Sequence, residues 1–166
     1  MRIGFSKDIH KTEIGKKLIL CGIEIPSDFG LESHSDGDCA IHAIVEAIFG
    51  AMNVGDLGSH YPPSDDKYKN ISSLYFLEDA KNIMDEQGYE IENIDVFISC
   101  EKPKLKDFIL SMREKVSEIL KTDIKRISIK AGTNEKMDCV GRGEAIEAYC
   151  VCLLKEKEYE WEKSKS

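Results

Sequence analysis

"SDGDCAIHAIVEAIFGAM", residues 35–52, is the stretch that decides the fold, because it joins a polar loop to a long apolar segment. Four apolar positions recur at the spacing of one helical face: Cys39, Ile44, Ala47 and Ile48. This pattern predicts a helix from Asp36 to about Met52, with Ser35 or Asp36 as its cap. An apolar helical face of this length must pack against a sheet or against other helices.

The rest of the chain alternates between predicted strands and predicted helices. Strands are expected at residues 1–9, 17–25, 94–100, 124–131 and 144–154, with a turn or bulge at Gly22. Helices are expected at residues 72–88, opened by a serine cap, and at residues 105–121. This order indicates an α+β fold, in which a mixed sheet of about four strands carries helices on one face. We expect one domain over residues 1–157 and a charged, frayed tail at residues 158–166.

Bulk composition narrows the class of protein. A net charge of −8 over 166 residues argues against nucleic-acid binding, which usually needs a basic face. No apolar run approaches the ~20 residues of a membrane span, and the N-terminus has no signal-peptide pattern. The six cysteines form no C-x-x-C pair and lie mostly in apolar runs, which indicates buried, reduced thiols in a cytoplasmic protein.

Three side chains have the chemistry of a metal site. Asp8 and His10 are two residues apart on a predicted strand and therefore share a face. His42 lies in the predicted helix, where Asp38, one turn earlier, can orient its imidazole. Considered separately, Asp8 and His10 could simply form a hydrogen bond at the surface, and His42 could be a buried core histidine. Together they would make an Asp/His/His site with one open tetrahedral position, the arrangement of catalytic zinc.

Two further segments favour phosphate chemistry. His34 and Ser35 precede a predicted helix N-terminus, where free backbone N–H groups attract anions. In "AGTNEKMDCVGRGEA", residues 131–145, Thr133 can donate to a phosphoryl oxygen, Glu135 can hold Mg²⁺, and Arg142 can bind phosphate or carboxylate. Taken alone, the glycine-flanked arginine would more simply be a turn with a surface salt bridge.

These segments together resemble the 2-C-methyl-D-erythritol 2,4-cyclodiphosphate synthases of the non-mevalonate isoprene pathway. The resemblance runs from Met1 to about Lys155 and depends on the following motifs: "DIH", "HSDGDCAIHAI", "GDLGSHYP", "KPK", "TNEK" and "GRGEAI". It implies a homotrimer with sheets packed around the trimer axis and active sites shared between subunits. The implied reaction is that of a metal-dependent cyclising phosphorus–oxygen lyase. The 2-phosphate of 4-diphosphocytidyl-2-C-methyl-D-erythritol 2-phosphate attacks the β-phosphorus, forming the cyclic diphosphate and releasing CMP.

The resemblance also assigns roles to residues by position. Asp8, His10 and His42 correspond to the ligands of Zn²⁺ or another divalent cation, and Glu135 to the ligand of Mg²⁺ or Mn²⁺ on the substrate diphosphate. His34 and Thr133 correspond to the groups that orient phosphate and stabilise the transition state. Substrate contacts are expected at Asp8, His10, His34, Ser35, Asp56, Leu57, Gly58, Tyr61, Asp65, Cys100, Lys104, Gly132, Thr133, Asn134, Glu135, Cys139 and Arg142.

Two other functions stay open from the residues alone. A zinc phosphohydrolase would use the open metal position to activate water against a nucleotide diphosphate. A non-catalytic trimeric relative would keep the scaffold and bind only metal or ligand. The chain also departs from the usual family pattern at Phe5-Ser6-Lys7, Pro63, Gly132, Asp138 and Cys139.

Overall fold

The computed structural model describes residues 1–158, so residues 159–166 of the predicted tail lie outside the described residues. The strands are β1 (Arg2–Ile14), β2 (Leu18–Leu20), β3 (Ile23–Ile25), β4 (Phe29–Leu31), β5 (Tyr89–Ser99), β6 (Ile127–Gly132) and β7 (Ala145–Glu156). The α-helices are α1 (Cys39–Met52), α2 (Leu57–His60), α3 (Leu74–Glu86), α4 (Ile109–Leu120) and α5 (Asp138–Gly141). Short 3₁₀ turns occur at Asp66–Tyr68, Lys106–Phe108 and Ile124–Arg126.

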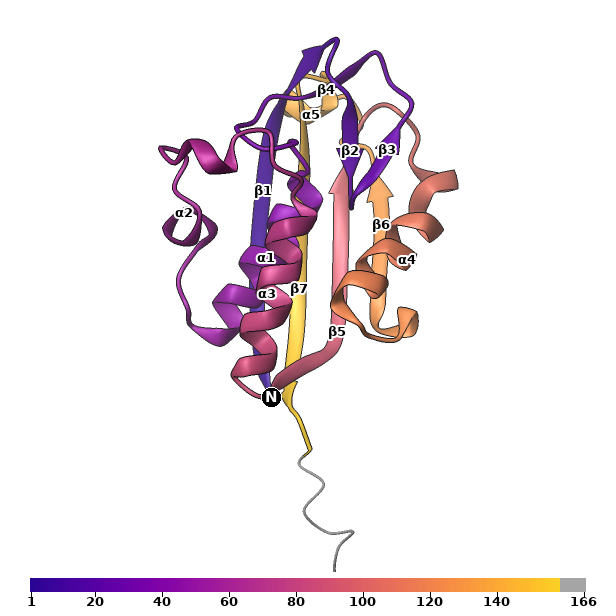
Figure 1. The fold of residues 1–166 in the computed structure, drawn as a ribbon. Helices are drawn as coiled ribbons and strands as arrows, with labels where there is room; N and C mark the ends of the chain where they lie inside the picture. The colour runs from indigo at the N-terminus through magenta and orange to yellow at the C-terminus, as the bar shows by residue number, and fades with distance from the viewer. Residues whose placement is uncertain (159–166) are drawn as a thin grey trace, which may run out of the picture.

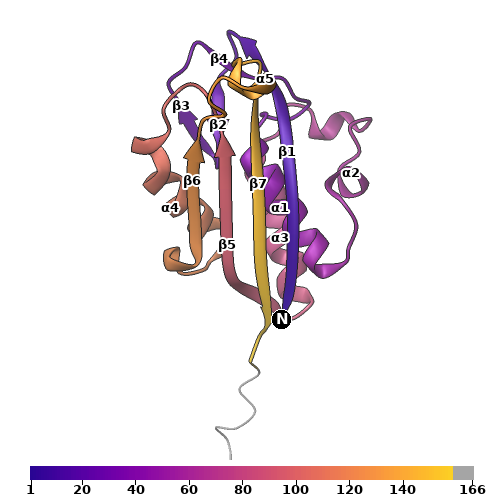
Figure 2. The same ribbon diagram turned by 180° about the vertical axis from the view of Figure 1, so that it is seen from behind.

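One mixed sheet forms the back of the molecule. Its strand order is β4-β1-β7-β5-β6, with β5 and β6 parallel and the other neighbours antiparallel. Helices α1, α3 and α4 cover one face (Figure 1), and the opposite face is bare in the reverse view (Figure 2). The predicted α+β fold with helices on one face is confirmed. The sheet has five strands rather than about four, because the three-residue β4 adds an edge that is too short to produce a periodic pattern.

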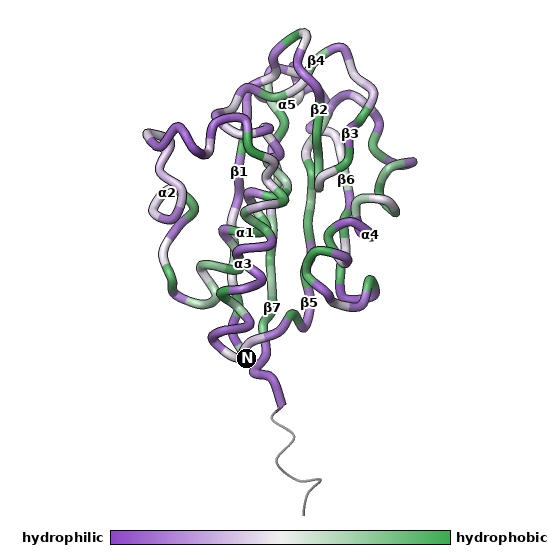
Figure 3. The backbone as a smooth tube through the Cα atoms, viewed as in Figure 1, coloured by the Kyte–Doolittle hydropathy of each residue, from purple (hydrophilic) through white to green (hydrophobic). Residues whose placement is uncertain are grey.

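Helix α1 lies against the sheet and is buried at every position except Glu46 and Gly50. Figure 3 shows hydrophobic residues along the neighbouring β5 and β7, which supply the other side of this core. Gly4 permits the close approach of α1 to β1, since a Cβ atom there would lie 1.8 Å from the carbonyl oxygen of Ala47. This contact fixes the helix across β1 and so sets the distance between His42 and the side chains of β1.

The predicted strand at residues 17–25 is a hairpin, β2–β3, that pairs apart from the main sheet. Cys21 and Gly22 form its turn with φ angles of 50° and 74°, a left-handed conformation that tight hairpin turns require. The carboxylate of Asp38 accepts hydrogen bonds from the backbone N–H groups of both turn residues and from that of Ile41. Asp38, rather than the predicted Ser35 or Asp36, is therefore the cap of α1.

The bare face of the sheet carries apolar side chains from β1 and β7. Ile3, Phe5 and Ile9 are exposed by 71%, 65% and 42%, and Val151 by 40%. Phe5 and Val151 are direct cross-strand partners, and their side chains therefore lie on the same face. Exposed apolar clusters of this kind mark interaction surfaces.

Candidate metal centre and neighbouring cavities

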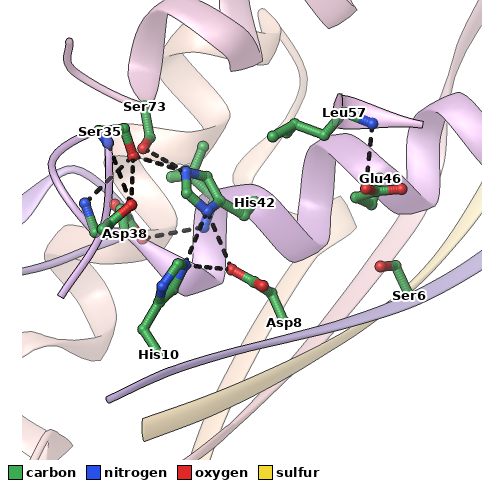
Figure 4. Close-up of polar contacts among 12 residues, drawn as sticks. Ser6, Asp8, His10, Ser35, Asp38, His42, Glu46, Leu57 and Ser73 are labelled. Carbon is green, nitrogen blue, oxygen red and sulfur yellow. Dashed lines mark hydrogen bonds and ion pairs between the residues drawn. The ribbon is translucent and has the colours of Figure 1, made fainter. Parts of the chain in front are cut away.

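Asp8, His10 and His42 form the metal cluster. Asp8 and His10 lie within β1, two residues apart, and His42 faces them from the first turns of α1 (Figure 4). Asp8 Oδ2 lies 2.8 Å from His10 Nε2 and 3.0 Å from His42 Nδ1, and the two nitrogens are 3.2 Å apart. One ligand atom from each residue thus converges on a single point, and the cluster could hold a metal ion. The predicted convergence of the three residues is confirmed.

Each histidine is held through its other ring nitrogen. His10 Nδ1 lies 3.0 Å from the carbonyl oxygen of Glu32, which can only accept, so that nitrogen carries the proton. His42 Nε2 lies 2.9 Å from Ser73 Oγ and 3.2 Å from Ser35 Oγ. The nitrogens that face Asp8 are therefore the ones left to bind a metal, and the donor set fits a divalent ion such as zinc.

The cluster is also an electrostatic unit. Burial disfavours the charged carboxylate of Asp8, but hydrogen bonds and charge from His10 and His42 outweigh burial and hold its pKa well below the usual range. Burial likewise disfavours protonated His10, but the hydrogen bond and charge of Asp8 dominate and raise its pKa. The site therefore keeps an ionised carboxylate in place, which a cation can bind.

The prediction that Asp38 orients the His42 imidazole is wrong. The Asp38 carboxylate is fully buried and its hydrogen bonds go to backbone N–H groups of the hairpin turn and of α1. Among the described residues, the side-chain hydrogen bonds of His42 go to Asp8, His10, Ser35 and Ser73, and none goes to the Asp38 carboxylate. Burial and the charge of Asp36 raise the pKa of Asp38 to about 6, against the lowering effect of those hydrogen bonds.

A cavity of about 300 Å³, the metal cavity, opens beside the metal cluster. Besides the three cluster residues, four predicted site residues line it: His34, Ser35, Leu57 and Tyr61. Within residues 1–158, the buried Nε2 atom of His34 has no hydrogen-bond partner, so it is available to a ligand. The hydroxyl group of Tyr61 donates a hydrogen bond to Asp79. Burial, and to a smaller extent this hydrogen bond, raises the pKa of Tyr61.

Three predicted site residues of the neighbouring segment 56–65 do not line the metal cavity. Asp56 caps α2 and accepts hydrogen bonds from the backbone and hydroxyl groups of Ser59 at 2.7 and 2.6 Å. Asp65 caps the next 3₁₀ turn through Lys67 N–H, and Gly58 lies within α2. In this structure the two acids hold the loop that carries Leu57 and Tyr61, and Glu46 of α1 accepts the N–H of Leu57 at 3.1 Å.

A second cavity, of about 450 Å³, lies at the β6 edge of the sheet. Four of its lining residues were predicted as substrate contacts: Cys100, Lys104, Gly132 and Thr133. Next to it, Thr133 Oγ1 donates to Glu135 Oε1 at 2.9 Å, and Ser99 Oγ donates to Asn134 Oδ1 at 3.0 Å. A Cβ atom at Gly132 would lie 2.9 Å from the ring of Phe97, so a larger residue here would require that ring to move.

The remaining predicted residues lie in and beside α5. Arg142 forms a two-point ion pair with Glu144 at 2.9 and 3.0 Å, and Cys139 is partly exposed. Lys7, one of the departures from the family pattern, pairs with Glu147 at 2.8 Å, and Glu147 also accepts from Tyr149. This part of the bare face therefore carries charged groups beside Ile9, whereas Ile3, Phe5 and Val151 lie nearer the start of β1.

The metal cavity and the second cavity lie apart in one chain. The metal cluster is anchored on β1, and the second cavity adjoins β6. Strands β7 and β5 separate these two elements, so at the usual ~4.8 Å between strands they are about 14 Å apart. No residue lines both cavities within the described part of the chain.

The sequence of this chain matches a known protein family. The model of the YgbB family matches residues 1–155. The chain belongs to the YgbB family. Among curated relatives, the 2-C-methyl-D-erythritol 2,4-cyclodiphosphate synthase of Brachyspira hyodysenteriae is 56% identical, over 93% of this chain and 98% of its own length. The synthase of Finegoldia magna is 51% identical, over 95% and 99%.

Two solved structures superpose well on this chain. The bifunctional IspDF of Campylobacter jejuni gives a TM-score of 0.91 at 37% identity, and this chain covers 42% of that longer chain and 95% of itself. The IspF of Plasmodium falciparum, solved as a CDP complex, gives 0.84 at 33% identity, covering 95% of this chain and 97% of that one.

No helix within residues 1–158 has the length and apolar character to cross a bilayer.

Proposed function

We propose that this chain converts 4-diphosphocytidyl-2-C-methyl-D-erythritol 2-phosphate to 2-C-methyl-D-erythritol 2,4-cyclodiphosphate with release of CMP. The observation that carries the proposal is the convergence of Asp8, His10 and His42 beside a cavity. Its support is identity of 51–56% to relatives that are named as this synthase. A step in isoprene biosynthesis by the non-mevalonate pathway follows from that activity.

The reaction needs no nucleophile from the protein. An oxygen of the substrate's 2-phosphate forms a bond to the β-phosphorus, and the bond from that phosphorus to the CMP oxygen breaks. Bound Zn²⁺ at the metal cluster and Mg²⁺ or Mn²⁺ at Glu135 would neutralise phosphate charge and polarise the phosphorus–oxygen bonds. The protein's own work is to position the two reacting groups.

Two side chains are assigned to the phosphates. His34 Nε2 is buried in the metal cavity and, within the described residues, unpaired, so a phosphate oxygen would satisfy it. Thr133 Oγ1 donates to Glu135 in this structure and can turn to a phosphoryl oxygen when a cation occupies the Glu135 carboxylate. Ser35 and the loop through Leu57 would hold the methylerythritol, and the second cavity would hold the cytidine.

The active form is proposed to be a homotrimer with each active site between two subunits. Two observations support it: strands β1 and β6, beside which the two cavities lie, are about 14 Å apart in one chain, and apolar Ile3, Phe5 and Val151 are exposed on the bare sheet face. A neighbouring subunit packed on that face would cover the apolar residues and could bring its own second cavity to the metal cavity. The cytoplasm is the proposed location, supported by six free cysteines.

The test is a ³¹P NMR time course of the protein with this substrate and Mg²⁺, with and without a chelator. We expect resonances of the cyclic diphosphate and of CMP, and we expect chelation to abolish both. Open-chain phosphates would instead identify a zinc phosphohydrolase. An unchanged spectrum from zinc-loaded protein would contradict catalysis and leave a metal-binding relative.

A further inference from the structure

Ser73 is a buried residue that no part of the proposed function uses, yet its hydroxyl reaches the metal cluster. It precedes α3 and is fully inaccessible to solvent. The sequence predicts a serine that caps its own helix, but the Ser73 hydroxyl makes no such cap. It lies instead 2.9 Å from His42 Nε2, about thirty residues away in the chain.

Asp36 determines how this hydroxyl is used. The Asp36 carboxylate accepts from both the hydroxyl and the backbone N–H of Ser73. The Ser73 hydroxyl has one proton and donates it in the hydrogen bond to Asp36. Toward His42, the oxygen of Ser73 can therefore act only as an acceptor. His42 Nε2 then carries the ring proton, and Nδ1, which faces Asp8 and His10, keeps its lone pair.

We infer that Asp36 and Ser73 form a relay that positions His42 for metal binding, with Ser73 as the decisive positioning residue. The relay fixes both the orientation and the tautomer of the imidazole. It takes the role that sequence reasoning gave to Asp38, whose carboxylate is occupied elsewhere. Ser35 is 3.2 Å from the same nitrogen, but its oxygen also contacts Ser33 and Gly37, so it is not committed to His42.

The inference rests on the proposed metal site, and its test is zinc affinity. Partners of a ligating histidine typically contribute about 10–100-fold to metal affinity. We expect Ser73→Ala to lose zinc affinity by this factor in a competition with a chromophoric chelator. Ser72→Ala is the matched control, because Ser72 Oγ accepts from Leu74 N–H at the same helix start but does not contact His42. It should stay within about twofold of the wild type, well below the loss expected for a partner of a ligating histidine.

A second measurement separates positioning from a general loss of packing. In zinc-loaded wild type, the His42 Nε2 proton should give a protected resonance in ¹⁵N-resolved NMR, and in Ser73→Ala this resonance should be lost to solvent exchange. Asp36→Asn keeps an acceptor but removes the charge, so its zinc affinity should lie between that of the wild type and that of Ser73→Ala. This variant replaces Ser73→Ala in the test if Ser73→Ala does not fold. Unchanged zinc affinity in both variants would overturn the relay. If the wild type itself binds no zinc, the metal site fails as well.

Discussion

The metal cluster and the second cavity are built in opposite ways. The metal cluster is enclosed between β1 and α1, and each of its two histidine rings is held through the nitrogen that does not face Asp8. At the second cavity, Thr133 and Glu135 are exposed just after the end of β6, and the Thr133 hydroxyl donates a hydrogen bond to the Glu135 carboxylate. One chain therefore brings the three metal ligands together by itself, whereas under the proposed function a neighbouring subunit is needed to complete the phosphate and nucleotide side.

The largest effect is expected from His42→Ala, which removes a ligand from the enclosed site. The variant should lose stoichiometric zinc, and turnover should fall by more than the 10–100-fold expected for a supporting residue, that is by at least about 10²-fold. Metal content after dialysis, measured by mass spectrometry, checks the first expectation. A protein that keeps one zinc per chain would remove His42 from the ligand set.

Glu135→Ala should separate the two regions. Because Glu135 lies outside the metal cluster, zinc should be retained at the wild-type level while Mg²⁺-dependent turnover is lost. Glu114→Ala, at an exposed position of α4, is the control for removal of a surface carboxylate. Undiminished turnover in Glu135→Ala would exclude this residue from the mechanism.

Mixed oligomers sharpen the same comparison. If one subunit supplies the metal cluster and its neighbour supplies Glu135, then co-expression of His42→Ala and Glu135→Ala chains restores some intact sites. In equal, randomly assembled mixtures, half of the sites have an intact metal cluster from one subunit, and half of these also have an intact Glu135 from the neighbouring subunit. About a quarter of wild-type turnover is therefore expected. The absence of any recovery in purified mixed oligomers would place both groups of a site in the same chain.

A smaller effect is expected from pH. Asp8 raises the pKa of His10, and below that pKa the proton on the imidazole must leave before a metal binds. The raised pKa of His10 lies above the ordinary histidine pKa of about 6.5. Below this raised pKa, zinc affinity should therefore fall by about tenfold for each unit of decrease in pH. Chelator competition between pH 5.5 and 8 measures it. A flat profile over that range would contradict the coupling of His10 to Asp8.

The sequence by itself determined the fold class, most elements and the metal ligands. Periodicity identified α1 and the strands β5 and β7, because apolar side chains must alternate or recur to be buried. The two-residue spacing in "DIH" placed Asp8 and His10 on one face, since strand side chains alternate. The family motifs then linked His42 to them across 32 residues of chain.

Only the tertiary structure decided which polar groups support those ligands. Asp38 has the helical spacing to reach His42, yet it binds the β2–β3 turn, whose position no local pattern predicts. Ser73 has the local pattern of a helix cap, yet its hydroxyl joins Asp36 to His42 because α3 packs against α1 at that point. Local propensity reports only neighbours in sequence, whereas a buried hydroxyl binds whichever partner the packing brings within 3 Å.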